Sequence, residues 1–465
     1  ACYVPLGHVA PRAQGLLGLG DDGDAASDEP PRQISMTAAV AALKALLEDS
    51  GVLKVGHNIK YDMQVLAKHG IDVAPIDDTM VLSYVLEGGL HGHGLDELAT
   101  LHFGHANIKF SEVAGSGKNQ IGFHEVALEA AVPYASEDAD ITGRLHRLLK
   151  PRLVYDHMVA IYETIERPLI PVLAEMERTG IKVDDGVLRE LSEDFDRRGA
   201  DLAEAIYGLA GHEFNIGSPK QLGEILFDEM SLPGGKKGKT GAYATGADVL
   251  EGLAAQGHDL PSRVLDWRQL AKLKSTYTDA LIGQINPDTR RVHTSYGQAI
   301  ASTGRLSSTD PNLQNIPIRT EMGREIRKAF IAEGNNHLLS ADYSQVELRI
   351  LAHLSGDEAL IEAFQMGEDI HTRTACEIFG TSADRLDAEA RRMAKAVNFG
   401  IVYGLSAFGL SRQLKIYPKE AKKFIDQYFA LYKKVKVYME ETVAEAKEVG
   451  YTQTMMNRKR YMPDL

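Results

Sequence analysis

The stretch RRMAKAVNFGIVYG (residues 391–404) places two cationic and two aromatic side chains at intervals of four: Arg391, Lys395, Phe399 and Tyr403. On a helix of about 3.6 residues per turn, each step of four drifts by only about 40°, so the four share one slowly winding face. Arg binds phosphate oxygens through its forked donors, and aromatic rings stack on sugars and bases. An apolar core stripe would not carry both cations. The pattern therefore indicates a nucleotide-binding helix.

A second stretch, LLSADYSQVELR (338–349), reads as an apolar strand that ends at Asp342 and turns into a helix beginning near Val346. A carboxylate at such a junction is held in place by the rigid backbone of the strand and is exposed to solvent. Mg²⁺ takes oxygen ligands, usually one or two carboxylates together with substrate phosphates. From these residues alone, Asp342 is as readily a helix N-cap as a metal ligand.

Both strings resemble family A DNA polymerases, the first as the fingers helix and the second as the palm strand. The resemblance implies a right-hand polymerase domain (thumb, palm and fingers) that adds deoxynucleotides to a primer 3′-OH with two Mg²⁺ ions. It implies metal binding by Asp342 and the Tyr343 carbonyl, and Lys395 as a general acid. Its dNTP-binding residues would be Gln345, Glu347, His371, Arg391, Lys395, Phe399 and Tyr403. Glu347 would block a ribose 2′-OH, and Phe399 would disfavour dideoxynucleotides. Taken alone, His371 would more often be an ordinary surface histidine.

A third string, TGRLSSTDPNLQNIP (303–317), is rich in turn residues and hydrogen-bond donors. Such a segment is usually only a connecting loop. Its donors could also reach minor-groove acceptors, which lie in similar places in every base pair. The string is typical of family A polymerases, which implies primer-template contacts by Arg305, Asn312 and Gln314.

The segment FNIGSPKQL (214–222) resembles the thumb of the same family, and Ser218 should open a helix whose N-terminus can face a phosphate. The Gly- and Lys-rich run that follows carries Lys236, Lys237 and Lys239, either as a solvated linker or as phosphate contacts.

The front of the chain alternates short apolar runs with helical patterns, with a helix over 40–48, a strand over 52–55 and helices over 62–69 and 131–149. We expect Pro151 to end the last helix. Two strings, KVGHNIKYDMQVL (54–66) and YASEDA (134–139), resemble motifs of DnaQ-like 3′–5′ exonucleases. The resemblance implies a ribonuclease H-like α/β fold, with Asp62 and Asp138 as metal ligands and Tyr134 orienting a water.

No Asp-x-Glu on a strand precedes these motifs, and the acidic run DDGD (21–24) reads as a solvated loop. We therefore do not expect proofreading. The family's later His-Asp-Glu motif is also absent, so we expect a fragment cut at both ends. A catalytically incomplete chain that only binds primer-template DNA and dNTP is the alternative function, and a nuclease is the third.

The expected domains are an exonuclease-like domain (1–152), a mostly helical thumb (153–285), part of the palm (286–350), and the fingers with the start of the return to the palm (351–465). The net charge of −14 does not suggest a nucleic-acid partner, but residues 234–330 carry 14 Lys and Arg against 9 Asp and Glu. Two cysteines exclude a disulfide framework and a cysteine zinc site. The sequence has no apolar run of membrane-spanning length and no signal peptide, so we expect a cytoplasmic protein. The resemblance to family A polymerases implies a monomer.

Overall fold

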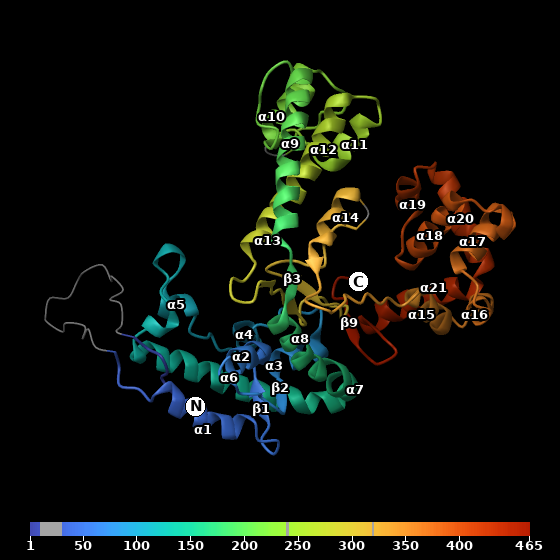
Figure 1. Cartoon of the computed structure of the whole chain (residues 1–465). Helices are drawn as coiled ribbons and strands as arrows, with labels where there is room; N and C mark the ends of the chain where they lie inside the picture. Colours follow the sequence, from blue (N-terminus) through green and yellow to red (C-terminus); the bar gives the residue numbers. More distant parts are fainter. Residues whose placement is uncertain (10–29, 239–240, 319) are drawn as a thin grey trace. The chain divides into compact units, whose positions relative to one another are not determined.

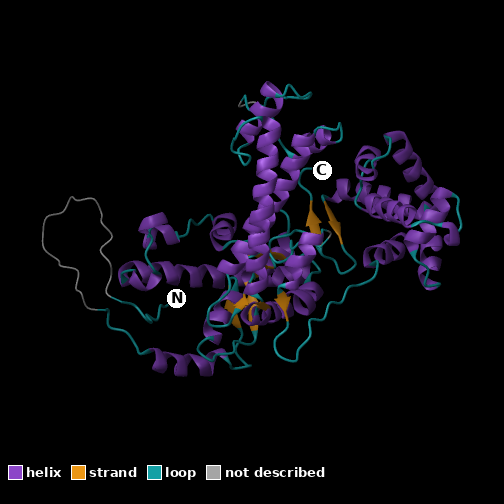
Figure 2. Cartoon of the chain, turned by 45° about the horizontal axis from the view of Figure 1, so that its top comes forward, coloured by secondary structure: helices purple, strands orange, loops and turns teal. Residues whose placement is uncertain are grey.

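The computed structural model describes residues 1–9, 30–238, 241–318 and 320–465, and it divides into two compact units, Ala1–Leu338 and Leu339–Leu465 (Figure 1). The units are considered separately below. Figure 2 shows that helices dominate, with a few short strands. No helix of the described ranges is long and apolar enough to span a bilayer. Lys239 and the acidic run 21–24 lie outside the described residues.

The front of the first unit is a layer of helices around two parallel strands. The strands are β1 (Lys54–Gly56) and β2 (Ile76–Asp78), with Lys54 opposite Ile76. The helices are α1 (Met36–Leu47), α2 (Ile59–Ala67), α3 (Thr79–Glu87), α4 (Leu95–Phe103), α5 (Phe110–Ala114), α6 (Leu128–Tyr155), α7 (Val159–Ile161) and α8 (Arg167–Thr179). Short 3₁₀ or π turns join them, η1 (Gly117–Asn119), η2 (Phe123–Glu125) and η3 (Tyr162–Glu166). The predicted helices over 40–48 and 62–69 are confirmed within α1 and α2, and the strand begins later than predicted because Val52 and Leu53 are exposed.

Helix α6 corrects one prediction, because it continues through Pro151 instead of ending before it. A proline inside a helix removes one backbone hydrogen bond and introduces a clash with the preceding turn. On either side of it, Leu149 and Leu153 are almost completely buried in the core of the front layer. Burial of these two side chains offsets the local cost, so the helix ends only at Tyr155.

The middle of the first unit is helical, with α9 (Asp185–Ala210) and α12 (Asp259–Leu273) running side by side (Figures 1 and 2). The remaining elements are α10 (Pro219–Glu224), η4 (Ile225–Glu229), α11 (Ala247–Ala254), η5 (Lys274–Asp279) and α13 (Ala280–Gly283). Buried Ile206, Leu250 and Val264 form part of its core.

Two small antiparallel sheets complete the first unit. One has the order β4-β3-β7, built from β4 (Arg291–Val292), β3 (Ile181–Val183) and β7 (Phe330–Ile331); the other pairs β5 (Ser295–Gly297) with β6 (Ser307–Thr309). Helix α14 (Glu321–Lys328) precedes β7. Gly180 lies at φ +63° between α8 and β3, where an added Cβ would lie 2.7 Å from the Val292 carbonyl oxygen. Only glycine fits this tight turn without strain.

The second unit is a helical cluster around a single core that includes Leu348, Val397, Phe424 and Tyr428. Its helices are α15 (Val346–Ser355), α16 (Glu358–Gln365), α17 (Ile370–Phe379), η6 (Ala383–Arg385), α18 (Ala388–Val402), α19 (Ala407–Leu414), α20 (Pro418–Leu431) and α21 (Lys433–Val449). A hairpin of β8 (Tyr451–Gln453) and β9 (Lys459–Tyr461) follows.

The strand predicted over residues 338–341 is not present, and this prediction was wrong. Leu338 is 56% exposed and Leu339 is 92% exposed. A strand requires a neighbour for its backbone hydrogen bonds, and none of the described strands pairs with this segment. The helix expected near Val346 does form, as α15.

Candidate nucleotide-binding site

Helix α18 carries the stripe that the sequence predicts. Asp387 caps its first turn by accepting a hydrogen bond from the Ala390 amide at 2.7 Å. Arg391, Lys395 and Phe399 line a cavity of about 410 Å³ together with the segment 342–347 and His371. Tyr403 is the C-cap residue, and its ring stacks on Phe399 with centroids 6.3 Å apart and planes 16° apart. The predicted helix is confirmed, and the two cations and two aromatic rings follow one another along one face.

Asp369, at the N-cap of α17, holds the cavity wall together. Its two carboxylate oxygens accept hydrogen bonds from the Arg391 Nε at 2.6 Å, the Gln345 Nε2 at 3.0 Å and the Thr372 hydroxyl at 2.8 Å. Partial burial opposes ionisation, but the bonds from Arg391, Thr372 and Gln345 outweigh it and lower the pKa of Asp369 to about 2. The carboxylate is therefore ionised at neutral pH. Sequence reasoning missed this residue, although an Asp before a helical run is a recognisable N-cap signal.

His371 is not a surface histidine, because only 3% of it is exposed. Its ring lies against Phe399, with centroids 5.6 Å apart. Burial lowers the pKa of His371 to about 4; the Asp369 charge opposes this shift, while the charges of Arg391 and Lys395 act in the same direction as burial. The ring is therefore neutral near pH 7 and contributes to the cavity as a hydrogen-bonding group without a positive charge.

The acidic segment lies on the cavity wall without forming a strand. Asp342 is exposed and has no hydrogen bond or ion pair with any described residue, while Glu347 is half-buried in the first turn of α15. The alternative that Asp342 caps α15 was wrong, since the N-cap is Gln345, in a left-handed conformation with φ 53°. Asp342 therefore remains available for a ligand that approaches through the cavity.

Among the described residues, no group of three or more His, Cys, Asp or Glu side chains is arranged to hold a metal ion. The cavity lining includes Asp342, Tyr343 and Glu347, and the predicted ligands among them are the Asp342 carboxylate and the Tyr343 carbonyl. This donor set suits Mg²⁺, which keeps several water ligands and takes others from substrate phosphates. It does not suit an ion that needs a complete cage of protein ligands.

The exonuclease-like residues of the first unit lie on two different helices. Asp62 is exposed on α2, whose start is held by the buried Asp78 carboxylate through the amides of Asn58 at 3.1 Å and Ile59 at 2.9 Å. Asp138 is half-buried on α6, where the Tyr134 hydroxyl donates a hydrogen bond to it.

Burial, together with neighbouring acidic groups, raises the pKa of Asp138 to about 6. Asp138 is therefore near its protonation midpoint at mildly acidic pH. The predicted pairing of Tyr134 with Asp138 on one helix face is present, but no described interaction links Asp62 with Asp138.

The predicted DNA-contacting residues of the first unit are exposed. Arg305, Asn312 and Gln314 lie around β6, and the Asn312 Oδ1 accepts a hydrogen bond from the Gln314 amide at 3.0 Å. Buried Ser308 and Ile316 hold this segment to the unit. The connection is therefore anchored at two points while its polar side chains face solvent.

The residues predicted for the thumb lie in the helical middle of the first unit. Ser218 caps α10 by accepting a hydrogen bond from the Gln221 amide at 3.4 Å. Lys236 and Lys237 are exposed, and the Lys237 ammonium lies 4.5 Å from the centre of the Tyr243 ring. The helix start predicted at Ser218 is confirmed, and the lysines remain accessible to a phosphate.

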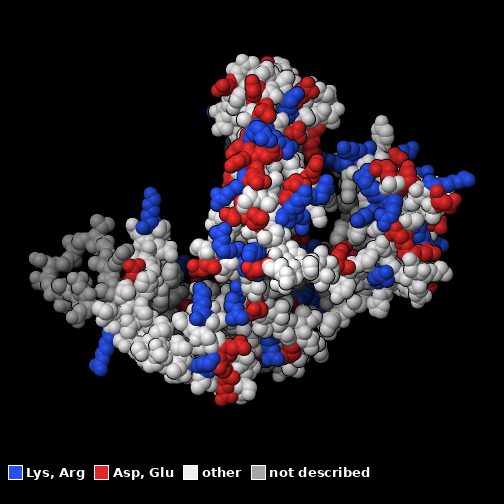
Figure 3. Space-filling model, in the orientation of Figure 1, with Lys and Arg blue, Asp and Glu red and all other residues white. Residues whose placement is uncertain are grey.

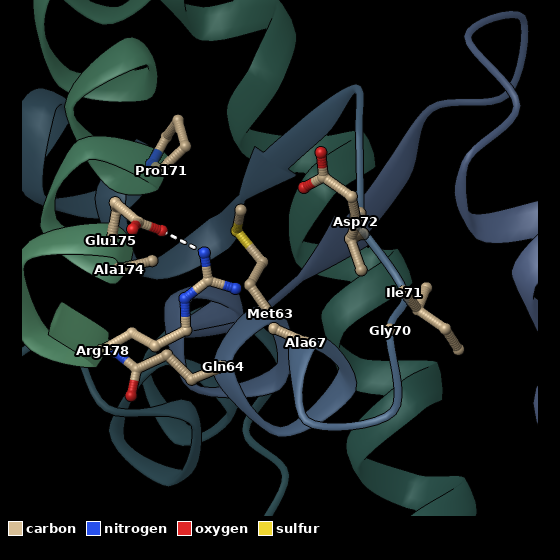
Figure 4. A pocket seen from close by; sticks show the side chains of 11 residues that line it. Met63, Gln64, Ala67, Gly70, Ile71, Asp72, Pro171, Ala174, Glu175 and Arg178 are labelled. Atoms are coloured by element: carbon tan, nitrogen blue, oxygen red, sulfur yellow. Dashed lines mark hydrogen bonds and ion pairs between the residues drawn. The ribbon is translucent and has the colours of Figure 1, made fainter. Parts of the chain in front are cut away.

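Other cavities lie in the first unit, one of them about 570 Å³ and lined in part by Lys60, Glu177 and Tyr296. Figure 3 shows Lys and Arg side chains gathered on the visible face of the second unit around α18 and α19, with acidic side chains beside them. A cavity of about 370 Å³ between α2 and α8 contains Arg178, but that side chain is paired with Glu175 (Figure 4). That cavity contains none of the residues singled out by the sequence.

Comparison with known proteins agrees with the motifs. The family model described as "DNA polymerase family A" matches residues 185–465, and the model described as "3'-5' exonuclease" matches residues 23–154. DNA polymerase I of Rhizobium leguminosarum is 51% identical over the whole chain, which covers 45% of that protein. DNA polymerase I of Pseudomonas aeruginosa is 47% identical, again over the whole chain and 50% of the relative. The chain thus spans about half the length of these curated relatives.

A solved structure gives the same relationship. The POL domain of Pol1 from M. smegmatis, in complex with DNA primer-template and dNTP, has a TM-score of 0.82 and 40% identity, covering 92% of this chain and 72% of that one. An exonuclease domain is followed by a polymerase domain, as the sequence motifs indicate. Together with the fingers-type helix α18 and its cavity, these matches show that the chain belongs to DNA polymerase family A.

Proposed function

We propose that this chain carries the nucleotide-selecting part of a DNA-templated DNA polymerase, which adds deoxynucleoside monophosphates to a primer 3′-OH. The cavity of about 410 Å³ carries the proposal, because it joins two cations, an aromatic ring and an unpaired carboxylate. Triphosphate, sugar and metal ions each find a chemically matched partner there. The solved relative that holds primer-template DNA and dNTP supports the same assignment.

Different residues of α18 would bind different parts of a dNTP. Arg391 and Lys395 would bind the phosphates, while Phe399 would pack on the deoxyribose and Tyr403 against the nascent base pair. Because the Arg391 Nε is engaged by Asp369, its terminal nitrogens remain for phosphate oxygens. Lys395 would also donate a proton to the departing pyrophosphate. Closing of this helix over a correct base pair would contribute to fidelity.

Asp342 and the Tyr343 carbonyl would hold two Mg²⁺ ions, which supply charge neutralisation of the phosphates and activation of the 3′-OH. Gln345 and Glu347 lie on the same wall, and Glu347 would exclude a ribose 2′-OH. The protein's own contribution is therefore to fix the carboxylate and the triphosphate contacts around one cavity.

Primer-template DNA would be held by Arg305, Asn312, Gln314, Ser218 and the lysine run, through contacts that specify no sequence. These roles follow the proposed division into an exonuclease-like domain (1–152), thumb (153–285), palm (286–350) and fingers (351–465). Proofreading by the front domain is not part of the proposal. We further propose a monomer that acts in the bacterial cytoplasm, as expected for replication and repair of the chromosome.

The test is primer extension on a recessed template with Mg²⁺ and four dNTPs, comparing the chain with Asp342→Ala. Asp426→Ala is the matched control, because Asp426 is an exposed carboxylate on α20 that pairs with Lys422 at the surface. Duplex binding is measured in parallel by fluorescence anisotropy. Extension by the parent chain and by Asp426→Ala, but not by Asp342→Ala, supports the proposal.

If no chain extends a primer while all three bind the duplex, the alternative of a DNA- and dNTP-binding fragment replaces the polymerase proposal. Failure of all three to bind the duplex contradicts both.

A further inference from the structure

A chain of four buried polar side chains crosses the core of the second unit and ends at His371. The Tyr432 hydroxyl lies 3.2 Å from the Thr374 hydroxyl, which in turn lies 3.2 Å from the Asn398 Oδ1; the Asn398 Nδ2 lies 2.9 Å from the His371 Nδ1. Their exposed fractions are 0% for Tyr432 and Thr374, 1% for Asn398 and 3% for His371. Burying so many polar groups is costly unless each is satisfied, so the direction of every hydrogen bond matters.

The directions follow from what each atom can do. An amide nitrogen only donates and an amide oxygen only accepts, so Asn398 donates to the His371 Nδ1 and accepts from Thr374. The single Thr374 hydrogen is used in that bond. Tyr432 must therefore donate to the Thr374 oxygen. With Asn398 in this orientation, each of the three bonds has one donor and one acceptor.

The last bond decides where the His371 proton lies. Because Nδ1 accepts a hydrogen bond, it carries no hydrogen, and the neutral ring must carry its hydrogen on Nε2. With the Asn398 amide oriented as in the structure, the opposite tautomer would place an N–H against the Asn398 N–H and leave a buried donor without an acceptor. His371 also lines the cavity that contains Arg391 and Lys395.

We propose that Asn398, oriented by Thr374 and Tyr432, is a positioning residue that fixes His371 as the neutral Nε2–H tautomer, ready to donate one hydrogen bond to a nucleotide phosphate oxygen. The nucleotide role rests on the proposed function, whereas the tautomer does not. A neutral donor adds direction to phosphate binding without adding a third positive charge beside Arg391 and Lys395. Burial and these two cations, which lower the pKa of His371, act together with the hydrogen-bond chain.

The test is a long-range ¹H–¹⁵N NMR correlation of the full chain labelled at histidine, recorded without nucleotide at pH 7. The chain has 16 histidines, so the His371 signals are assigned by their loss in His371→Gln. We expect Nδ1 to resonate as an unprotonated nitrogen and Nε2 as a protonated one. Asn398→Asp replaces the donating nitrogen by an accepting oxygen, and it should move a proton onto Nδ1.

Variants at Thr374, the next residue in the row of hydrogen bonds, provide an independent test should Asn398→Asp fail to fold. Thr374→Val removes the hydroxyl that orients Asn398 and should give a mixture of tautomers, while Thr374→Ser should restore the single form. A protonated Nδ1 in the parent chain, or an identical ring pattern in Thr374→Val and the parent, would overturn the proposal.

Nucleotide binding is measured separately, by titrating dATP and Mg²⁺ into the parent chain and Thr374→Val bound to a primer-template that calls for dATP. We expect affinity to fall about twofold in Thr374→Val, because a ring divided evenly between the two tautomers is competent to donate only half of the time, and to recover in Thr374→Ser. An unchanged affinity despite a changed tautomer would contradict the phosphate contact by His371. A parent chain that binds no dATP but has the expected tautomer would contradict the proposed function and leave the hydrogen-bond chain supported.

Discussion

The guanidinium Nε of Arg391 lies 2.6 Å from a carboxylate oxygen of Asp369, which joins the stripe of cations and aromatic rings on α18 to the N-cap of α17. The other oxygen of Asp369 accepts a hydrogen bond from Gln345, at the start of α15. One carboxylate therefore sets the positions of side chains from three helices. The Asp369 carboxylate holds the Arg391 side chain at its Nε atom. The direction of the two terminal guanidinium nitrogens is therefore fixed as well.

Replacing Asp369 by Asn should raise the KM for dNTP about tenfold and change kcat less, because Arg391 and Gln345 lose a charged acceptor worth about 1.5 kcal/mol. Steady-state primer extension at varied dNTP concentration measures both constants. Asp426→Asn, an exposed substitution in the same unit, is the control and should leave KM unchanged. Equal KM values in Asp369→Asn and the parent would show that Arg391 does not need this support.

Replacing Lys395 by Ala should lower kcat/KM for dNTP about 100-fold, since a charge-assisted phosphate contact and a proton donor are lost together. Arg392→Ala is a sharp control because it removes a cation from the same helix, outside the cavity lining and paired with Glu389. Single-nucleotide incorporation should separate the two variants. Similar losses of kcat/KM in Lys395→Ala and Arg392→Ala would mean that the face of α18 carrying Lys395 is not the face that binds dNTP.

The stability of the second unit should fall in acid partly through His371. Its pKa of about 4 lies below the ordinary value of 6.5, because burial disfavours the charged ring. Between these values the unfolded chain binds more protons, so this contribution is complete above pH 6.5 and is lost as pH falls toward 4. Urea unfolding at pH 7 and pH 4.5 should show the parent losing about 2 kcal/mol more than His371→Gln. Parallel losses in the two chains would contradict a buried neutral ring.

Glu177 should be important for the stability of the first unit. It is 7% exposed and accepts hydrogen bonds from Lys60, Gln64 and the Tyr296 amide. Glu177→Gln leaves the half-buried Lys60 without its counter-charge and should lower the free energy of unfolding by about 3 kcal/mol.

The matched control is Glu175→Gln on the same helix, whose carboxylate is 59% exposed and pairs with Arg178 at the surface (Figure 4). We expect it to cost less than about 1 kcal/mol, measured by urea unfolding. Equal losses at the two positions would argue against a special role for the buried carboxylate.

The sequence predicted the features that depend on neighbours along the chain. The stripe of α18 follows from spacing, and the Ser218 cap follows from residue type and position. The motifs also indicated the family, because strings such as 391–404 carry both the helical spacing and the chemistry. Sequence patterns therefore predict helices and their caps where the structure depends on residues close together along the chain.

The features that the sequence did not predict depend on contacts between distant segments. The continuation of α6 through Pro151 depends on the buried leucines around it, and the missing strand at 338–341 depends on a partner strand. Asp369 resembles an ordinary N-cap until its oxygens are found to contact Arg391 and Gln345. Asn398 sits inside a motif string, yet only its position in the core reveals what it contacts.

The bonds between α8 and the segment 296–301 have an evolutionary consequence. The side-chain amide of Gln298 donates a hydrogen bond to the Glu166 backbone carbonyl at 2.7 Å, and the Glu177 carboxylate accepts one from the Tyr296 backbone amide. The Tyr84 hydroxyl of α3 donates to the Ala301 backbone carbonyl. Lys60 and Tyr84 of the exonuclease-like layer, together with Glu166 and Glu177 that follow it in the chain, thus hold the stretch that leads into the predicted primer-template loop. Purifying selection on Lys60 or Tyr84 would persist in a lineage that had lost nuclease chemistry, so the retention of this layer is no evidence that it still cuts DNA.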